Sequence, residues 1–367
     1  MNTIRFHMPV EVIRREGALQ EVGTRAAAFG KRCLILTGAS SAQQNRALED
    51  ALTSLKAAGV EATVFPGISP NPTIAECRAA ADAAEAAGAH SLLAIGGGSV
   101  MDAAKAVAWM SAHFIVDPEV LFRGELKRDP MPLMVCGTTA GTGSEVSAVA
   151  VITDDHGKKR SVKSPRCYAR IAFCDPRYTD TMPRSVTVST ALDALCHAVE
   201  GYLNPTCDAL SSLFAEQALP LLTDGLAELC DTELPDKDGR DRLFDGALLA
   251  GAVLNTCGTA FPHPMGYVLT EDHGIPHGQA CAVFLPALLD CAREAVPERY
   301  ERMLGFCGGE ERLRHILQTL TDVEVTMTDE QLAVYDRRFS SLPHYARVPG
   351  GFDGEQASAL LRTLFAK

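Results

Sequence analysis

The chain has 367 residues and a formal net charge of −12, which allows about two or three domains of ordinary size. The acidic balance argues against a nucleic-acid partner, because binding to polyanions needs a basic surface. We also expect no membrane partner, since the first residues carry no apolar signal segment and no run of about 18 apolar residues occurs.

The twelve cysteines are spread along the whole chain without a C-x-x-C pair. Such a distribution is not typical of a disulfide framework or of a zinc ribbon. Several of them stand within apolar segments, where a reduced cysteine packs as a small hydrophobic side chain. The composition therefore favours a reducing compartment, and we expect the protein to be cytoplasmic.

In the first half of the chain, short apolar runs alternate with segments of helical periodicity. The predicted strands are 32–37, 60–65, 91–95 and 132–136. The predicted helices are 44–58, 73–87 and 100–111, and Thr73 with Glu76 forms a capping-box signature at the start of the second. This alternation predicts a parallel sheet with helices on both faces. A hairpin is expected from 147–153 and 158–163.

After residue 184 the strand signals nearly vanish. The remaining predicted helices are 188–203, 208–229, 241–256, 280–295 and 355–366. We therefore expect two domains, an α/β domain over residues 1–184 and an all-helical domain over residues 185–367.

Two loops rich in small residues suit a phosphate-bearing ligand. Gly97, Gly98 and Ser99 follow a predicted strand and open a helix, where backbone N–H groups and the helix dipole favour an anion. The sequence is not G-x-G-x-x-G, and a plain strand-to-helix turn is the alternative. The loop after the next strand adds the hydroxyl groups of Thr138, Thr139 and Thr142. Two such loops at neighbouring strand ends mark the place where α/β sheets bind ligands.

A carboxylate and three imidazoles form a candidate metal site. Asp193 and His197 are four residues apart in an apolar helical segment and share one helical face. His263 and His277 each stand beside proline or glycine, in segments that break helical periodicity. Such a donor set suits Fe²⁺ or Zn²⁺. A helix-surface pair or a buried, satisfied histidine is the alternative reading of the first two residues, and His273 is a competing ligand.

In these motifs and their order, the chain resembles the iron-containing (group III, metal-dependent) alcohol dehydrogenases over nearly its whole length. The segments that carry the resemblance are 70–73 (PNPT), 96–105 (GGGSVMDAAK), 138–145 (TTAGTGSE), 174–176 (CDP), 193–202 (DALCHAVEGY) and 276–278 (PHG).

The resemblance implies a dehydroquinate synthase-like architecture, with an N-terminal dinucleotide-binding domain, an all-α C-terminal domain and an active site between them. It implies that Asp193, His197, His263 and His277 are both metal ligands and catalytic residues. The spacing of the last two histidines matches the family, which favours His263 over His273. The implied cofactor residues are Gly97, Gly98, Ser99, Asp102, Thr138, Thr139, Thr142 and Lys159.

Two positions depart from the family pattern. Some members have a histidine thought to assist proton transfer where this chain has Tyr267, which we expect to be a catalytic residue although its reference pKa is about 10. NAD-preferring members have an aspartate where this chain has Gly38, followed shortly by Ser40 and Ser41. A carboxylate would repel a 2′-phosphate, so we expect NADP(H) to be used at least as well as NAD(H).

The resemblance implies reversible hydride transfer between a nicotinamide and a small alcohol or functionalised aldehyde, with Fe²⁺ or Zn²⁺ as Lewis acid. It also implies a homodimer. The alternatives are a glycerol dehydrogenase or maleylacetate reductase, a dehydroquinate-synthase-like lyase that uses a metal and a nicotinamide, and a non-catalytic protein that has kept the fold.

Overall fold

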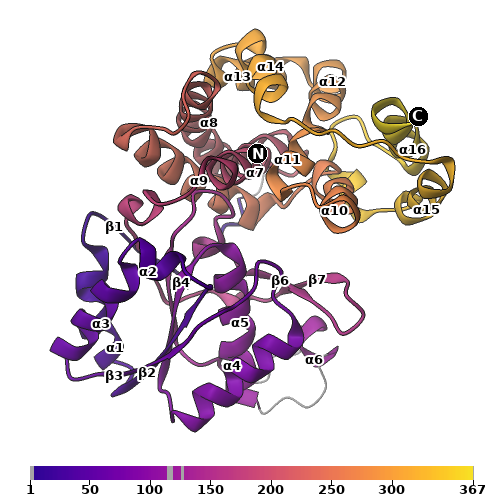
Figure 1. Cartoon of the computed structure of the whole chain (residues 1–367). Coiled ribbons are helices and arrows are strands. Elements are labelled where there is room, and N and C mark those ends of the chain that lie inside the picture. The colour runs from indigo at the N-terminus through magenta and orange to yellow at the C-terminus, as the bar shows by residue number, and fades with distance from the viewer. Residues whose placement is uncertain (1–3, 114–118, 125–127, 367) are drawn as a thin grey trace. The chain divides into compact units, whose positions relative to one another are not determined.

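The computed structural model describes residues 4–113, 119–124 and 128–366, and the chain divides into two compact units (Figure 1). One unit is Met8–Met182. The other is Pro183–Lys367 together with the short segment that precedes Met8. The helical unit therefore takes in the beginning of the chain as well as its second half.

Met8–Met182 is built on a six-stranded sheet in which every neighbouring pair is parallel, in the order β1-β8-β5-β4-β2-β3. The strands are β1 (Glu11–Arg14), β2 (Arg32–Thr37), β3 (Glu61–Phe65), β4 (Ser91–Gly96), β5 (Leu133–Gly137) and β8 (Ile171–Cys174). The four strands expected from the sequence are all present. The two strands that the sequence analysis missed, β1 and β8, have four residues each and show little periodicity.

Helices cover both faces of this sheet, as the alternation of strands and helices predicts. They are α1 (Val22–Ala27), α2 (Ser41–Gln44), α3 (Ala47–Ala57), α4 (Ile74–Ala86), α5 (Gly98–His113) and α6 (Glu119–Phe122). Cys33 and Ile35 on β2 belong to the hydrophobic core that includes α1 and α3. The alternate residues Leu34 and Leu36 are also fully buried, which is typical of a strand covered on both faces.

Two local features decide where helices begin in this unit. The expected helix 44–58 is interrupted at Arg46, whose φ of 67° is left-handed, so α2 and α3 are separate helices. Thr73 caps α4 as predicted: its side chain accepts from the Glu76 N–H, and the Glu76 carboxylate accepts from the Thr73 N–H.

The predicted hairpin is confirmed as the antiparallel pair β6 (Val149–Thr153) and β7 (Lys159–Lys163). A buried polar cluster connects it to α5. Lys105 Nζ donates to Val149 O at 2.8 Å and to Ser144 Oγ at 2.6 Å, and Asp102 Oδ2 accepts from the Val151 N–H at 2.9 Å. Lys105 and Asp102 together hold the hairpin beside the start of α5.

The second unit consists of helices, with no named strand among its described residues (Figure 1). They are α7 (Arg184–Leu203), α8 (Ala209–Asp231), α9 (Lys237–Cys257), α10 (Pro262–His273), α11 (His277–Ala282), α12 (Leu285–Ala295), α13 (Pro297–Cys307), α14 (Glu310–Leu320), α15 (Asp329–Phe339) and α16 (Gly354–Phe365). The expected helix 280–295 is in fact split between α11 and α12.

Helix α7 lies at the centre of this unit. Its residues are buried almost without interruption from Thr187 to Leu203, and α8, α9, α11, α12 and α13 all pack against it. A helix that is apolar on every side belongs in a core. The buried Asp193, His197 and Glu200 are therefore conspicuous, because buried ionisable groups are costly unless they are paired or bind a metal.

No single helix within the described ranges has both the length and the apolar character to cross a bilayer. Helices α9 and α10 are long and apolar enough only when taken together, and the chain bends by 112° between them.

Candidate metal centre and nucleotide loops

Asp193 and His197 lie on one face of α7, with the His197 Nε2 atom 3.6 Å from Asp193 Oδ1. Both are buried, with 4% and 5% of their surface exposed. Glu200 follows on the same face and is almost completely buried. The spacing of 193, 197 and 200 is that of residues stacked along one side of a helix.

His263 is in the first turn of α10, where Pro262 occupies a position in which a missing N–H costs nothing. Its orientation comes from Glu200. The carboxylate of Glu200 accepts from the Ala260 N–H at 2.7 Å and lies 2.6 Å from His263 Nδ1. Nε2 of His263 is then 3.3 Å from Asp193 Oδ1. Although the segment around His263 breaks helical periodicity in the sequence, it is helical in the structure, because prolines at 262 and 264 are compatible with a helix's first turn.

His277 is the first residue of α11, directly after the stretch that breaks helical periodicity in the sequence. Gly278 allows this helix to approach α7 closely, since a Cβ atom there would be 1.7 Å from the Ser189 carbonyl oxygen. The Gly278 N–H also donates to Ser189 Oγ at 3.2 Å. The result is that His277 Nε2 lies 3.8 Å from Asp193 Oδ1, with about a third of the His277 side chain exposed.

The structure therefore brings the four predicted ligands around one carboxylate oxygen. Asp193 Oδ1 and His263 Nε2 are buried, and neither completes a hydrogen bond within the described residues. Polar atoms left in this state are costly in a protein interior. A divalent cation bound among them would satisfy both, so the residues fit the metal that the donor set predicts.

Electrostatics favour the ionised carboxylate at this centre. Burial by itself would raise the pKa of Asp193, but the positive charge that His197, His277 and His263 can carry holds it well below its usual range. Burial would lower the pKa of His263, yet Glu200 and Asp193 outweigh it and raise that pKa to about 10. The site is thus arranged to hold positive charge next to Asp193.

Three further side chains define the surroundings. Tyr267, one turn after His263, stacks on the His277 ring with ring centroids 5.4 Å apart. The buried Cys281 has its Sγ atom 3.7 Å from both ring nitrogens of His277. His273, the competing ligand, instead contacts Tyr335 Oη at 3.3 Å through its Nε2 and is not among the clustered donors.

In Met8–Met182, the predicted cofactor residues lie at the carboxyl ends of three neighbouring strands. Thr37 pairs with Ile95, and Gly96 with Gly137, so the loops that follow β2, β4 and β5 begin at the same edge of the sheet. The chain passes from β2 to β3 on one side of β2 and then crosses to β4 on the other side of β2. A ligand site is expected at such a switch point.

The loops after β4 and β5 pack against each other with almost no space to spare. A Cβ atom at Gly98 would be 2.5 Å from Thr142 Cγ2, and one at Gly97 would be 3.0 Å from Thr139 Cγ2. The hydroxyl oxygens of Thr138 and Thr139 are buried with no hydrogen-bond partner among the described residues. These two hydroxyls therefore suit a polar ligand.

The other predicted cofactor residues are Asp102, Lys159, Gly38, Ser40 and Ser41, and they lie in different parts of this unit. Asp102 accepts from Ser144 Oγ at 2.6 Å and from the Val151 N–H, so both of its oxygens contact the protein. Lys159 begins β7, opposite Thr153. A Cβ atom at Gly38 would have no neighbour nearer than 3.8 Å, and Ser40 and Ser41 follow at the exposed start of α2.

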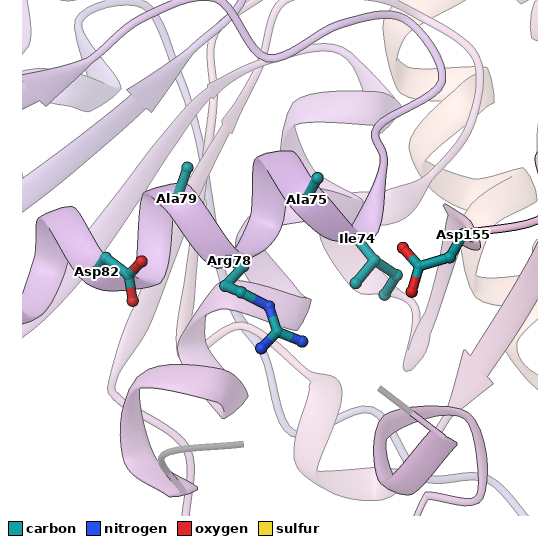
Figure 2. A pocket seen from close by; sticks show the side chains of 6 residues that line it. All are labelled: Ile74, Ala75, Arg78, Ala79, Asp82 and Asp155. Carbon is teal, nitrogen blue, oxygen red and sulfur yellow. The ribbon is translucent and has the colours of Figure 1, made fainter. Parts of the chain in front are cut away.

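Two of the surface concavities are lined by none of the predicted metal ligands or cofactor residues. One of about 350 Å³ runs along α4 and is lined by Ile74, Ala75, Arg78, Ala79, Asp82 and Asp155 (Figure 2). It contains none of the predicted ligands or cofactor residues.

Comparison with known proteins covers most of the chain. Residues 9–176 match the family described as iron-containing alcohol dehydrogenase, and residues 187–344 match the C-terminal family of Fe-containing alcohol dehydrogenases. An iron-containing alcohol dehydrogenase from Thermotoga maritima superposes with a TM-score of 0.91 at 32% identity, covering 98% of this chain and 99% of that one.

Two curated relatives have named cofactors. The NAD-dependent methanol dehydrogenase of Bacillus methanolicus is 29% identical over 83% of this chain and 79% of its own length. The NADPH-dependent butanol dehydrogenase of Clostridium saccharobutylicum is 28% identical over 82% of this chain and 77% of its own length.

Proposed function

Because this chain belongs to the iron-containing alcohol dehydrogenase family and is an oxidoreductase of that type, we propose that Asp193, His197, His263 and His277 hold its catalytic divalent ion. The observation that carries the proposal is the convergence of three imidazole nitrogens within 3.3–3.8 Å of Asp193 Oδ1. The unsatisfied atoms of Asp193 and His263 support it.

A bound divalent ion supplies a Lewis acid that polarises the substrate oxygen, which eases hydride transfer to or from the carbon that carries it. The residues around it hold and orient the donors. Glu200 fixes the imidazole of His263 through Nδ1 and leaves Nε2 facing Asp193. Fe²⁺ is the proposed ion and Zn²⁺ the alternative, since three histidines and a carboxylate accept both.

Tyr267 is the proposed catalytic residue for proton transfer. Its ring is stacked on His277, the more exposed ligand, which brings the residue next to the proposed ion. A phenol can give a proton to a developing alkoxide but is a poor shuttle at neutral pH.

The nicotinamide cofactor is proposed to bind at the carboxyl edge of the sheet. The pyrophosphate would bind at the start of α5, to Gly97, Gly98 and Ser99. The adjoining part of the cofactor would contact Thr138, Thr139 and Thr142. Asp102 would act by holding the β6–β7 hairpin, which carries Lys159, in place.

We propose that NADP(H) is used at least as well as NAD(H). Gly38 offers no carboxylate to repel a 2′-phosphate, and the hydroxyl groups of Ser40 and Ser41 can donate to one. The butanol dehydrogenase relative is NADPH-dependent, whereas the methanol dehydrogenase relative is NAD-dependent. The relatives therefore do not decide between NAD(H) and NADP(H), and the proposed preference rests on this chain's own residues.

The proposed substrate is a small primary alcohol or a functionalised aldehyde, acted on in the cytoplasm by a homodimer. The alternative assignments, glycerol dehydrogenase and maleylacetate reductase, are tested by assaying the protein with glycerol and with maleylacetate. An aldehyde panel assayed by NADPH and NADH oxidation, on protein loaded separately with Fe²⁺ and Zn²⁺, tests the proposal. Turnover without net change in NAD(P)H would favour a lyase instead.

A further inference from the structure

We propose that Cys207 and Cys257 form a redox-active pair, in which a hydroperoxide oxidises the Cys207 sulfur and Cys257 converts the product into a disulfide. Both cysteines belong to the helical unit, and neither is a proposed metal ligand. The pair therefore does not depend on the metal centre or on hydride transfer. It assigns a modification site to two of the twelve cysteines.

One asparagine holds the two cysteines close together. Cys207 lies in the connection between α7 and α8, and Cys257 is the last residue of α9. The Cys207 N–H donates to the Asn204 carbonyl oxygen at 2.9 Å, and the Asn204 side-chain amide donates to the Cys257 carbonyl oxygen at 2.8 Å. Because Asn204 is itself buried, it fixes these two distant parts of the sequence side by side.

The two side chains face each other. Both cysteines are buried, and the Cys257 thiol hydrogen-bonds to the Cys207 sulfur. A disulfide can form only between side chains directed at each other, because its sulfur atoms are bonded at about 2.05 Å. A pair of thiols that already share a hydrogen bond needs only a small approach to reach that geometry.

The surroundings of Cys207 favour its thiolate form. The hydrogen bond from Cys257 does most to lower the pKa of Cys207. Ser212 Oγ, 3.4 Å from the Cys207 sulfur, and the positive charge of Arg299 lower it further. Burial and the negative charge of Asp208 oppose these effects, and the pKa falls to about 7. The thiolate is the nucleophilic form, so a large fraction of Cys207 is reactive at neutral pH.

Most of the other cysteines are held as thiols. Burial raises the pKa of Cys33 to about 11 and that of Cys77 and Cys307 to about 12. The pKa of Cys257 is also raised, because its thiol donates to Cys207 and is buried. The pair therefore combines a nucleophilic sulfur with a neighbour that keeps its proton until it reacts.

A hollow of the surface brings small molecules close to Cys207. It has a volume of about 570 Å³ and lies between the start of α8 and α13, with Ser212 and Arg299 in its lining. Arg299 Nη2 donates to Ser212 Oγ at 3.1 Å, and that same hydroxyl contacts the Cys207 sulfur. The sulfur is thus one side chain away from the hollow, within reach of a peroxide but not of a protein thiol.

The reaction proceeds in two balanced steps. The Cys207 thiolate attacks one peroxide oxygen and the O–O bond breaks, which oxidises the sulfur to a sulfenic acid by two electrons. The peroxide is reduced to an alcohol, or to water, and takes a proton from solvent. The Cys257 sulfur then attacks the Cys207 sulfur, the S–O bond breaks, and the hydroxyl group leaves as water with the Cys257 proton.

The contrary role for these cysteines is packing alone, since buried cysteines often serve as small hydrophobic side chains. Such a pair would react with peroxide no faster than the other cysteines and would form no specific link. The site of oxidation therefore separates the two roles without any measurement of enzyme activity.

The test is oxidation of the full-length protein by one equivalent of hydrogen peroxide, with zinc bound because Fe²⁺ itself reacts with peroxide. Wild type should lose two thiols per chain, and its unreduced peptide map should contain one link, between Cys207 and Cys257. Dithiothreitol should restore both thiols. Cys230→Ser, which removes a partly exposed thiol on α8, should form the same link as wild type.

Two variants assign the order of the steps. Cys257→Ser should accumulate a sulfenic acid at Cys207 that dimedone labels, whereas Cys207→Ser should give neither a link nor a label at Cys257. In wild type, Cys207 should react about tenfold or more faster than Cys230. Equal rates at these two cysteines, or links spread over other cysteines, would overturn the inference. Both results come from wild type, so they hold even where a variant fails to fold.

Discussion

Glu200 Oε1 lies 2.6 Å from Nδ1 of His263, and its second oxygen accepts from the Ala260 N–H at 2.7 Å. One buried carboxylate on α7 therefore fixes both the segment that enters α10 and the ring at its start. The contact determines which nitrogen of His263 faces Asp193. Carboxylates that orient a ligating imidazole in this way affect metal affinity almost as strongly as the ligands do.

Replacing Glu200 with Ala should weaken metal binding by about 10–100-fold, because His263 would lose the partner that orients it. The dissociation constant for Zn²⁺, measured by competition with a chelator, checks this. Glu233→Ala, on the exposed segment after α8, serves as the matched control and should bind zinc as wild type does. Equal affinities in the two variants would contradict the role of Glu200.

Replacing Gly38 with Asp should shift the cofactor preference towards NADH by about tenfold or more in kcat/KM, since a carboxylate repels the 2′-phosphate of NADPH. The substitution is sterically possible, because a Cβ atom at 38 has no neighbour nearer than 3.8 Å. A wild-type preference of tenfold or more for NADH would contradict the proposed use of NADP(H). An unchanged ratio of kcat/KM for the two cofactors in the variant would contradict the role of position 38 in cofactor choice.

Replacing Lys105 with Ala should lower the free energy of unfolding by about 3–5 kcal/mol, because Asp102 would lose its buried counter-charge. The ammonium group also donates to Ser144 Oγ and Val149 O, so the β6–β7 hairpin would lose its connection to α5. Urea unfolding measures the change. Lys56→Ala, at an exposed position of α3, should stay within about 0.5 kcal/mol of wild type.

The sheet could be predicted from the sequence because its central strands are continuous apolar runs between clear turns. Strands β1 and β8, with four residues each, carry too little pattern to be found, and the break between α2 and α3 depends on one left-handed residue, Arg46. Helical periodicity also failed at α10, where two prolines in the first turn look like a break in sequence but are accommodated in a helix.

At the site, sequence spacing sufficed for Asp193 and His197, which one helix brings together. The structure is needed to show that α10 and α11 deliver His263 and His277 to the same oxygen atom. Glu200 was missed, although it had a signal, because it is the third polar residue on one face of the buried α7.

Stability should fall as the pH drops below 7, in part because of His344. Burial and the positive charges of Arg347 and His263 lower the pKa of His344 to about 4. In the unfolded chain the same imidazole takes up its proton near pH 6.5. The unfolded state therefore binds more protons between about pH 6.5 and pH 4, and the free energy of unfolding decreases through that window.

His344→Gln should flatten this part of the pH profile. Urea midpoints at pH 7 and pH 5 should differ less in the variant than in wild type, whereas His156→Gln, on the exposed turn of the hairpin, should follow wild type. A variant profile parallel to that of wild type would contradict the contribution of His344.

The measurement that bears most directly on the account is the rate of aldehyde-dependent NADPH oxidation as Fe²⁺ or Zn²⁺ is returned to metal-free protein, with bound metal determined in parallel. We predict a rate that rises with bound metal and saturates at one ion per chain, and no such response in Asp193→Ala. Full turnover in metal-free wild type, or in metal-free Asp193→Ala, would contradict the central claim that this buried carboxylate and its histidines form the catalytic metal centre.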